Sequence, residues 1–304
     1  MPTPDVRTLV LAAACAFVPP AAAQEAGDLD ALRRHALELV NADRAEEGLP
    51  ALRPGDALDD AAQGHAADMA ERGFYAHVAP DGTTPADRFR AAGGSRWALS
   101  GENIARCTGC APPPDRARAA AFHAGWMQSP DHRENVLDPG FDRMGFGIAG
   151  AESSVYAVQT FAGPGQAGDG DVLDAAGARA AALEAVNTRR GDLELGPLEP
   201  DAALDTVAEG VLGARLSGEP LPEDLFGLLP EGAGGWTGLE VRSASRGGAG
   251  GAMSAEVVRG FVETWDGADG TGPLGAEDAG HLGFAAAARD DGRAIAVAVF
   301  GTRG

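Results

Sequence analysis

The sequence predicts an α+β layer fold, and two observations support this prediction. Apolar residues recur with the period of a helix at 28–48 and 56–73, whereas the alternating apolar residues typical of strands come last, at 144–161. A chain of βαβ units would alternate the two patterns, so helices that precede strands favour an α+β fold. The 304 residues are enough for two soluble domains with ordinary cores.

The helices are predicted from their apolar faces and their ends. The segment 28–48 begins with aspartates that can cap a helix and ends at Gly48, while 56–73 ends at Gly73. A third helix is predicted at 113–128. The first apolar face consists of Leu32, Ala36, Leu39 and Val40, and the second consists of Leu58, Ala61, Ala62, His65 and Met69.

The strand pattern lies in "MGFGIAGAESSVYAVQTF", residues 144–161. Two alternating apolar runs flank a turn there, which predicts an antiparallel pair of strands.

An internal repeat follows from aligning the chain with itself. Residues 36–70 align without a gap on residues 182–216. The identical pairs include Leu37/Leu183, Val40/Val186, Asn41/Asn187, Arg44/Arg190, Pro54/Pro200, Leu58/Leu204 and Asp59/Asp205. Because alanine-rich composition would not place Asn, Arg, Pro and Asp in register, we expect two copies of one domain.

The domain boundary is predicted at a glycine-rich segment. Residues 164–171 have the composition of a linker, so the predicted domains are 27–163 and 172–304. The final apolar runs of the two copies also agree, "VYAVQTF" with "AIAVAVF".

The N-terminal residues and the charge indicate where the protein acts. Residues 1–23 combine Arg7, an apolar run over 9–18 and small residues at Ala21 and Ala23, which predicts a secretory signal peptide. Since the apolar run is too short to span a bilayer, we expect a mature protein without a membrane segment, secreted or periplasmic. A net charge of −21 repels nucleic acid, which is excluded as a partner, and anionic lipid surfaces.

Cys107 and Cys110 are the cysteines that follow the predicted signal peptide. In an oxidising compartment this spacing predicts a local disulfide, with a redox centre as the alternative. A thioredoxin-like motif would open a helix, but "APPP" follows Cys110, which favours the structural disulfide.

Four ordered motifs resemble one family. "GFYAHVAPDGTTPADRF", "GENIA", "AGWMQSPDHRENVLDPGFDRMGFGIA" and "YAVQTF" resemble the bacterial branch of the CAP superfamily, whose domain is also called SCP. The resemblance covers roughly residues 30–163. It implies a three-layer α-β-α sandwich with an antiparallel central sheet, and secretion. It also implies a cleft tetrad of two histidines and two glutamates that can hold a divalent cation.

The resemblance carries the tetrad onto three residues of this chain. By position the tetrad matches His77, Glu102 and His132, while Ser129 stands where the second glutamate would be. Ser129 can cap a short helix that carries His132, with Pro130 at its first position. Two imidazoles and one carboxylate form the set found at open zinc sites, so Zn²⁺ or another divalent cation is the expected cofactor.

Other polar residues are candidates for the same cleft. His65, Asn103 and Gln159 join Ser129 as possible members, although His65 on an apolar helix face also fits a hydrogen-bonded core histidine. Glu102 has an architectural alternative too, as a carboxylate that accepts backbone N–H groups in a tight turn. In the second copy Glu240 aligns loosely with Glu102, which predicts a role for Glu240 in folding.

Three functions fit these residues. The first is a non-catalytic module that binds a divalent cation or a small ligand. The second is a metal-dependent extracellular hydrolase of peptides or esters, which would need a proton shuttle that the motifs do not supply. The third is a carrier of lipids or sterols. The second copy has no counterparts of His77 and His132, so we expect a degenerate domain without a site of its own.

Overall fold

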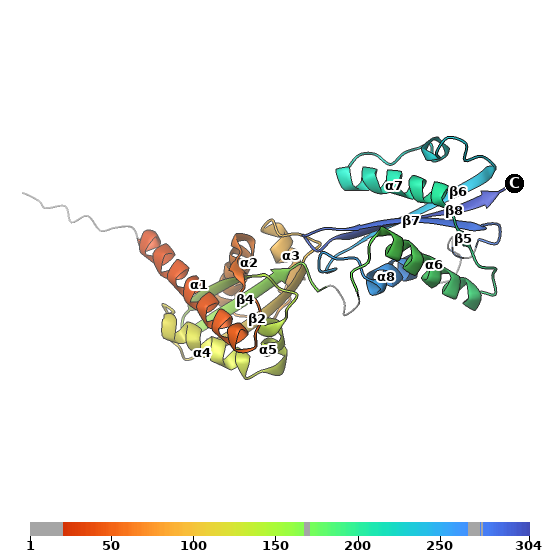
Figure 1. Cartoon of the computed structure of the whole chain (residues 1–304). Helices are drawn as coiled ribbons and strands as arrows, with labels where there is room; N and C mark the ends of the chain where they lie inside the picture. The colour runs from red at the N-terminus through yellow and green to blue at the C-terminus, as the bar shows by residue number, and fades with distance from the viewer. Residues whose placement is uncertain (1–20, 167–170, 267–273, 275) are drawn as a thin grey trace, which may run out of the picture.

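The computed structural model describes residues 21–166, 171–266, 274 and 276–304 (Figure 1). Most of the predicted signal peptide and the middle of the predicted linker, 167–170, lie outside the described residues. We refer to residues 21–166 as the first half and to residues 171–304 as the second half. Among the helices of the described residues, none is long and apolar enough to cross a membrane.

The first half is an α+β fold, as predicted. Its helices are α1 (Ala21–Glu46), α2 (Asp56–Arg72), α3 (Pro85–Ala91), α4 (Arg116–Met127) and α5 (Pro130–Leu137), and its strands are β1 (Arg53–Pro54), β2 (Leu99–Thr108), β3 (Arg143–Ala151) and β4 (Ser154–Gly163). The strand order is β1-β3-β4-β2, in which only the short β1 is parallel to its neighbour. This confirms the antiparallel central sheet.

Helices cover both faces of this sheet, which gives three layers (Figure 1). Helix α2 packs on β3 and β4, and its buried Ala62 and Met69 meet Val158. On the opposite face, α1 and α4 contribute Val40 and Trp126 to a second apolar cluster. The sheet is therefore buried between two helical layers, which confirms the predicted sandwich.

Some segments differ from the sequence-based prediction. Helix α1 begins at Ala21, so the helix predicted at 28–48 starts before the aspartates that were expected to cap it. The predicted helix at 113–128 begins at Arg116, where Asp115 caps it by accepting from Arg118 N at 2.8 Å. The motif "GENIA" lies in strand β2, so Glu102 is not in a tight turn. The helix predicted after Ser129 is α5, although the Ser129 side chain makes no capping hydrogen bond.

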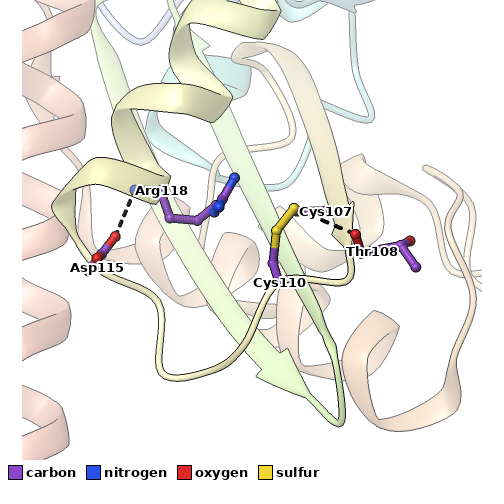
Figure 2. Close-up of a disulfide and its surroundings, with 5 residues drawn as sticks. All are labelled: Cys107, Thr108, Cys110, Asp115 and Arg118. Carbon is purple, nitrogen blue, oxygen red and sulfur yellow. Dashed lines mark hydrogen bonds between the residues drawn. A yellow bond between two sulfur atoms is a disulfide. The ribbon is translucent and has the colours of Figure 1, made fainter.

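The structure pairs Cys107 with Cys110, as the spacing predicts (Figure 2). Cys107 lies near the end of β2 and Cys110 in the connection to α4. Both sulfurs pack beside the apolar cluster under α1 and α4. The bond therefore ties this connection to the end of the edge strand, a structural role.

The second half has the strand order of the first. Its helices are α6 (Ala175–Asp192), α7 (Ala202–Ser217) and α8 (Ala255–Asp266), with the short helix η1 (Phe226–Leu228), and its strands are β5 (Glu199–Pro200), β6 (Trp236–Arg246), β7 (His281–Ala288) and β8 (Ala294–Arg303). The sheet order is β5-β7-β8-β6, again with only the first strand parallel to its neighbour.

A close approach of helix and strand occurs in both halves. A Cβ atom on Gly145 would lie 2.1 Å from the backbone of Leu58, and one on Gly283 would lie 2.1 Å from the backbone of Leu204. Any side chain at these two positions would push the helix away from the sheet. Glycine is thus required where α2 crosses β3 and where α7 crosses β7.

Each half is stabilised internally by polar contacts, and these contacts match between the halves. Asn41 exchanges two hydrogen bonds with the backbone of Leu52, at 3.0 and 2.8 Å, and Asn187 does the same with Leu198. The carboxylates of Asp59 and Asp205 accept from Phe146 N and Phe284 N at 2.8 and 2.9 Å. These identities of the aligned segments are therefore structural and do not mark a ligand site.

The prediction that Glu240 corresponds to Glu102 and has a role in folding is wrong. In the first half Thr160 pairs with Glu102 on one side and with Gly145 on the other. In the second half Val299 pairs with Val241 and with Gly283. Val241 thus occupies the position of Glu102, and Glu240 is displaced by one residue, which turns a strand side chain to the other face. Glu240 is 44% exposed and pairs with Arg242, so it has no buried role.

Candidate functional site

The site is built around His77, in the loop between α2 and α3. Helix α2 ends at Gly73, whose left-handed φ of 68° suits a glycine C-cap. The loop is then held by His65 on α2, whose Nε2 lies 2.9 Å from the carbonyl oxygen of Ala76. His77 follows directly and remains 47% exposed at its side chain. His65 therefore positions the loop that carries His77.

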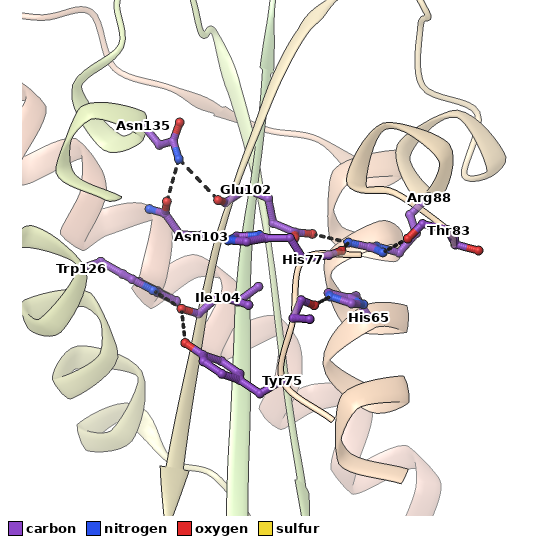
Figure 3. Close-up of polar contacts among 11 residues, drawn as sticks. His65, Tyr75, His77, Thr83, Arg88, Glu102, Asn103, Ile104, Trp126 and Asn135 are labelled. Carbon is purple, nitrogen blue, oxygen red and sulfur yellow. Dashed lines mark hydrogen bonds and ion pairs between the residues drawn. The ribbon is translucent and has the colours of Figure 1, made fainter. Parts of the chain in front are cut away.

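Glu102 lies on edge strand β2 and faces α2 and α3, with only 3% of its side chain exposed. Its Oε1 lies 2.8 Å from Nδ1 of His77, and its Oε2 lies 2.8 Å from Nη2 of Arg88 (Figure 3). Each carboxylate oxygen therefore has one charged or chargeable partner. The pairing satisfies a carboxylate that would be costly to bury alone.

Arg88 was not identified from the sequence. It comes from α3, which begins with a capping box between Thr84 and Asp87. Hydrogen bonds from Thr84 hold the pKa of Asp87 at about 2. Arg88 also donates to the carbonyl oxygens of Thr83 and His77, at 3.1 and 2.8 Å. The capping box and Pro85 in "TTPADRF" would have predicted this helix, but only the fold brings its arginine to Glu102.

His132 approaches from the other side of the edge strand, on α5. Burial lowers its pKa, and the neighbouring His77 lowers it further. The backbone of α5 is fixed because Asn103 donates to the carbonyl oxygen of His132 at 3.0 Å. Asn135 reaches back to Asn103 Oδ1 at 2.9 Å and to the Glu102 carbonyl oxygen at 3.3 Å. The two predicted histidines are therefore electrostatic neighbours that come from separate elements.

The other predicted site residues have different positions. Asn103 faces the sheet surface opposite to the Glu102 side chain, where it also donates to Gln159 Oε1 at 3.2 Å. Ser129 is the residue before α5 and is half-buried. Four side-chain atoms in this region are buried without a hydrogen-bond partner in the described structure, His65 Nδ1, Arg88 Nε, Gln159 Nε2 and Thr160 Oγ1. The fold thus brings together His65, His77, Arg88 and Glu102, with His132 at the strand edge.

The arrangement suits His77 as a ligand of a divalent cation better than it suits Glu102. Within the described ranges no group of three or more His, Cys, Asp and Glu side chains is placed to hold a metal ion. Glu102 fits poorly as a direct ligand, because only 3% of its side chain is exposed and each of its oxygens already has a partner. His77 does fit, because a carboxylate on one ring nitrogen leaves the other nitrogen to a metal. The candidate ligands are therefore the imidazoles of His77 and His132, with Glu102 paired to His77.

The buried imidazole of His65 makes stability depend on pH. Burial lowers its pKa below the ordinary value of 6.5, so the unfolded chain takes up this proton more readily. Stability is expected to be constant above about pH 6.5 and to fall as the pH drops below it. His65→Gln should flatten this fall in urea unfolding between about pH 7 and about pH 5. His35→Gln on α1 is the control, and an equal slope in both variants would refute the role of His65.

Comparison with known proteins gives these results. Residues 37–161 match the family described as "Cysteine-rich secretory protein family", or CAP. The uncharacterized protein YkwD of Bacillus subtilis is 32% identical over 135 residues, which are 44% of this chain and 48% of YkwD. The uncharacterized membrane protein YlbC of the same organism is 29% identical over 112 residues, or 37% of this chain and 30% of YlbC. The chain therefore spans less than half the length of these relatives.

A solved structure is also similar. An extracellular protein of Bacillus anthracis that contains an SCP domain is 27% identical, with a TM-score of 0.38. The match covers 49% of this chain and 45% of that protein.

Proposed function

Since residues 37–161 belong to the cysteine-rich secretory protein (CAP) family, we propose that the protein is an exported, non-catalytic binding module. Its first half would bind a divalent cation, Zn²⁺ being the probe of choice, through His77 and His132. Glu102 would orient His77 without being a ligand itself.

The observation that carries this proposal is the contact between His77 and Glu102. A carboxylate 2.8 Å from Nδ1 favours the tautomer with the proton on that nitrogen. The unprotonated Nε2 is then available to a metal, and the carboxylate raises its basicity. Because His77 is half exposed, this nitrogen can be reached from solvent.

His132 supports the same proposal from the other element. Its lowered pKa keeps the imidazole neutral near pH 7, which is the form that binds a metal. Arg88 offsets the negative charge of Glu102, so the site carries little net charge to attract a cation. We therefore expect moderate affinity, in keeping with a site that has two protein ligands and open positions.

The binding function is favoured over hydrolysis for a chemical reason. A metal-dependent hydrolase needs a free acid or base near the bound water. Glu102 is the carboxylate that contacts His77, and its two oxygens are held by His77 and Arg88. A proton shuttle would require Glu102 to leave one of these partners.

We also propose that the predicted domains, 27–163 and 172–304, are two copies of one ancestral unit, and that the second copy has no such site. The shared strand order and the matching contacts of Asn41 and Asn187 support this. Val241 stands in the position of Glu102, so the second half lacks the carboxylate that orients a histidine.

Calorimetric titration of the full chain with Zn²⁺ tests the proposed site. His77→Ala and His132→Ala are each expected to weaken binding by about 10- to 100-fold, and Glu102→Gln by about 10-fold through the loss of orientation. His35→Ala, on α1, is the matched control and should bind like the wild type. Unchanged affinity in both His77→Ala and His132→Ala would refute the site. Peptide or ester turnover that disappears in Glu102→Gln would favour the hydrolase instead.

A further inference from the structure

The two halves contact each other through main-chain hydrogen bonds at Trp97 and Pro164. Gly248 N donates to the carbonyl oxygen of Trp97 at 3.0 Å, and Gly250 N donates to that of Pro164 at 2.9 Å. Gly165 forms an antiparallel bridge with Ala249. Backbone hydrogen bonds therefore join the two halves beside Trp97.

Arginines from three separate segments gather at this junction. The guanidinium carbon of Arg96 lies 4.2 Å from the centre of the Trp97 ring, and that of Arg293 lies 4.6 Å from it. Arg215 at the end of α7 and Arg289 in the turn between β7 and β8 are electrostatic neighbours of Arg293. Two cations thus lie over one indole ring, and two more are electrostatic neighbours of Arg293, in a chain whose net charge is −21.

These arginines lack the partners that other arginines of the chain have. In the described part of the structure, none of the four forms an ion pair with a carboxylate within 4.0 Å, whereas Arg303 does. Nε of Arg215 and Nε of Arg293 are buried without a hydrogen-bond partner. A buried N–H that makes no hydrogen bond is costly, because it has lost water and gained nothing in return.

Ser245 and Asp291 are neighbours of Arg293, but they satisfy only part of its hydrogen-bonding capacity and charge. Arg293 Nη2 donates to Ser245 Oγ at 3.2 Å, a neutral acceptor. Asp291 lies near Arg293 and offsets some of its charge, but its Oδ1 accepts from the backbone N of Arg293 at 3.0 Å. The cluster therefore retains positive charge and free donors.

We propose that this cluster, Arg96 and Arg293 over Trp97 with Arg215 and Arg289 beside Arg293, is a binding site for a small oxyanion. The ligand is a phosphate, sulfate or carboxylate group, because guanidinium N–H groups match the oxygens of such anions. Arg215 and Arg293 supply the buried donors, and Trp97 holds Arg96 and Arg293 in place by cation–π contact. Since the cluster includes arginines of both halves, the site requires the assembled junction.

Calorimetric titration of the full chain at low ionic strength tests this site, with inorganic phosphate, inorganic sulfate and acetate as separate probes. Saturable binding of at least one anion is expected, and the strongest binder identifies the oxyanion class. Arg215→Gln and Arg293→Gln should each weaken that binding by about 10-fold or more. Arg303→Gln is the matched control, because Arg303 lies 4.3 Å over the ring of Trp236 but is paired with Asp201.

Two results would overturn the proposal. One is the absence of saturable binding with all three probes, which would reduce the cluster to a contact that joins the halves. The other is an affinity in Arg215→Gln equal to that of the wild type. The cation–π contacts of Trp97 are made by Arg96 and Arg293, so Arg215→Gln leaves them intact. The Arg215 variant therefore remains informative if Arg293→Gln disturbs the junction.

Discussion

Replacing Arg44 by methionine is expected to lower the free energy of unfolding by about 3–5 kcal/mol. Arg44 is fully buried, and its guanidinium donates to four carbonyl oxygens, those of Pro50, Val136, Asp138 and Phe141, at 2.9, 2.8, 3.0 and 3.5 Å. Methionine fills a similar volume but leaves these buried acceptors without donors. Urea unfolding of the variant and the wild type measures the loss.

The chain offers a matched pair and a control for this prediction. Arg190 in the second half is 2% exposed and donates to the carbonyl oxygens of Gly196, Leu274 and Ala276 at 2.7, 2.8 and 3.0 Å, so Arg190→Met should cost a similar amount. Arg53, 68% exposed and paired with Asp142, is the control, and Arg53→Met should cost less than about 1 kcal/mol. Equal losses for Arg44→Met and Arg53→Met would contradict the argument.

Placing a methyl group on Gly145 is expected to destabilise the protein by about 3 kcal/mol, at the upper end of ordinary overpacking. The added Cβ would lie 2.1 to 2.5 Å from backbone atoms of Leu58 and Asp59. Backbone atoms cannot rotate away, so helix α2 must move from the sheet. Because α2 also carries His65, the same variant should bind Zn²⁺ more weakly if the proposed site is correct.

Gly64→Ala is the control for the Gly145 variant. Gly64 lies in the interior of α2, and a Cβ atom there would meet nothing within 4 Å. Alanine is the better helix former, so this change should stabilise the protein by about 0.5–1 kcal/mol. Thermal unfolding of both alanine variants gives the comparison, and a loss of stability in Gly64→Ala would show that the open space around Gly64 is misjudged.

The candidate site was only partly predictable from the sequence. The motifs gave His77, Glu102 and His132, and the structure makes the two histidines electrostatic neighbours. They did not give Arg88, because an exposed-looking arginine in a short helix has no local pattern that distinguishes a buried ion pair. They also suggested Glu102 as a ligand, whereas its two oxygens are engaged by His77 and Arg88.

Strand β2 shows why the fold was harder to predict where the site lies. Its central residues include Glu102 and Asn103, polar side chains on opposite faces, so the alternation typical of a half-buried strand is absent. Each polar group is satisfied by a distant element: Arg88 on α3 for Glu102, and Asn135 on α5 for Asn103. Periodicity cannot reveal a strand whose buried side chains are polar.

By itself the sequence determined the order of helices and strands and the register of the aligned segments, because these follow from local periodicity and from identities such as Asn41/Asn187. Tertiary structure decided which of those identities are structural, that Val241 and not Glu240 occupies the position of Glu102, and which charges meet. The physical reason is distance along the chain. Ion pairs and buried donors join residues that are far apart in sequence, and only the packed sheet fixes which of them face one another.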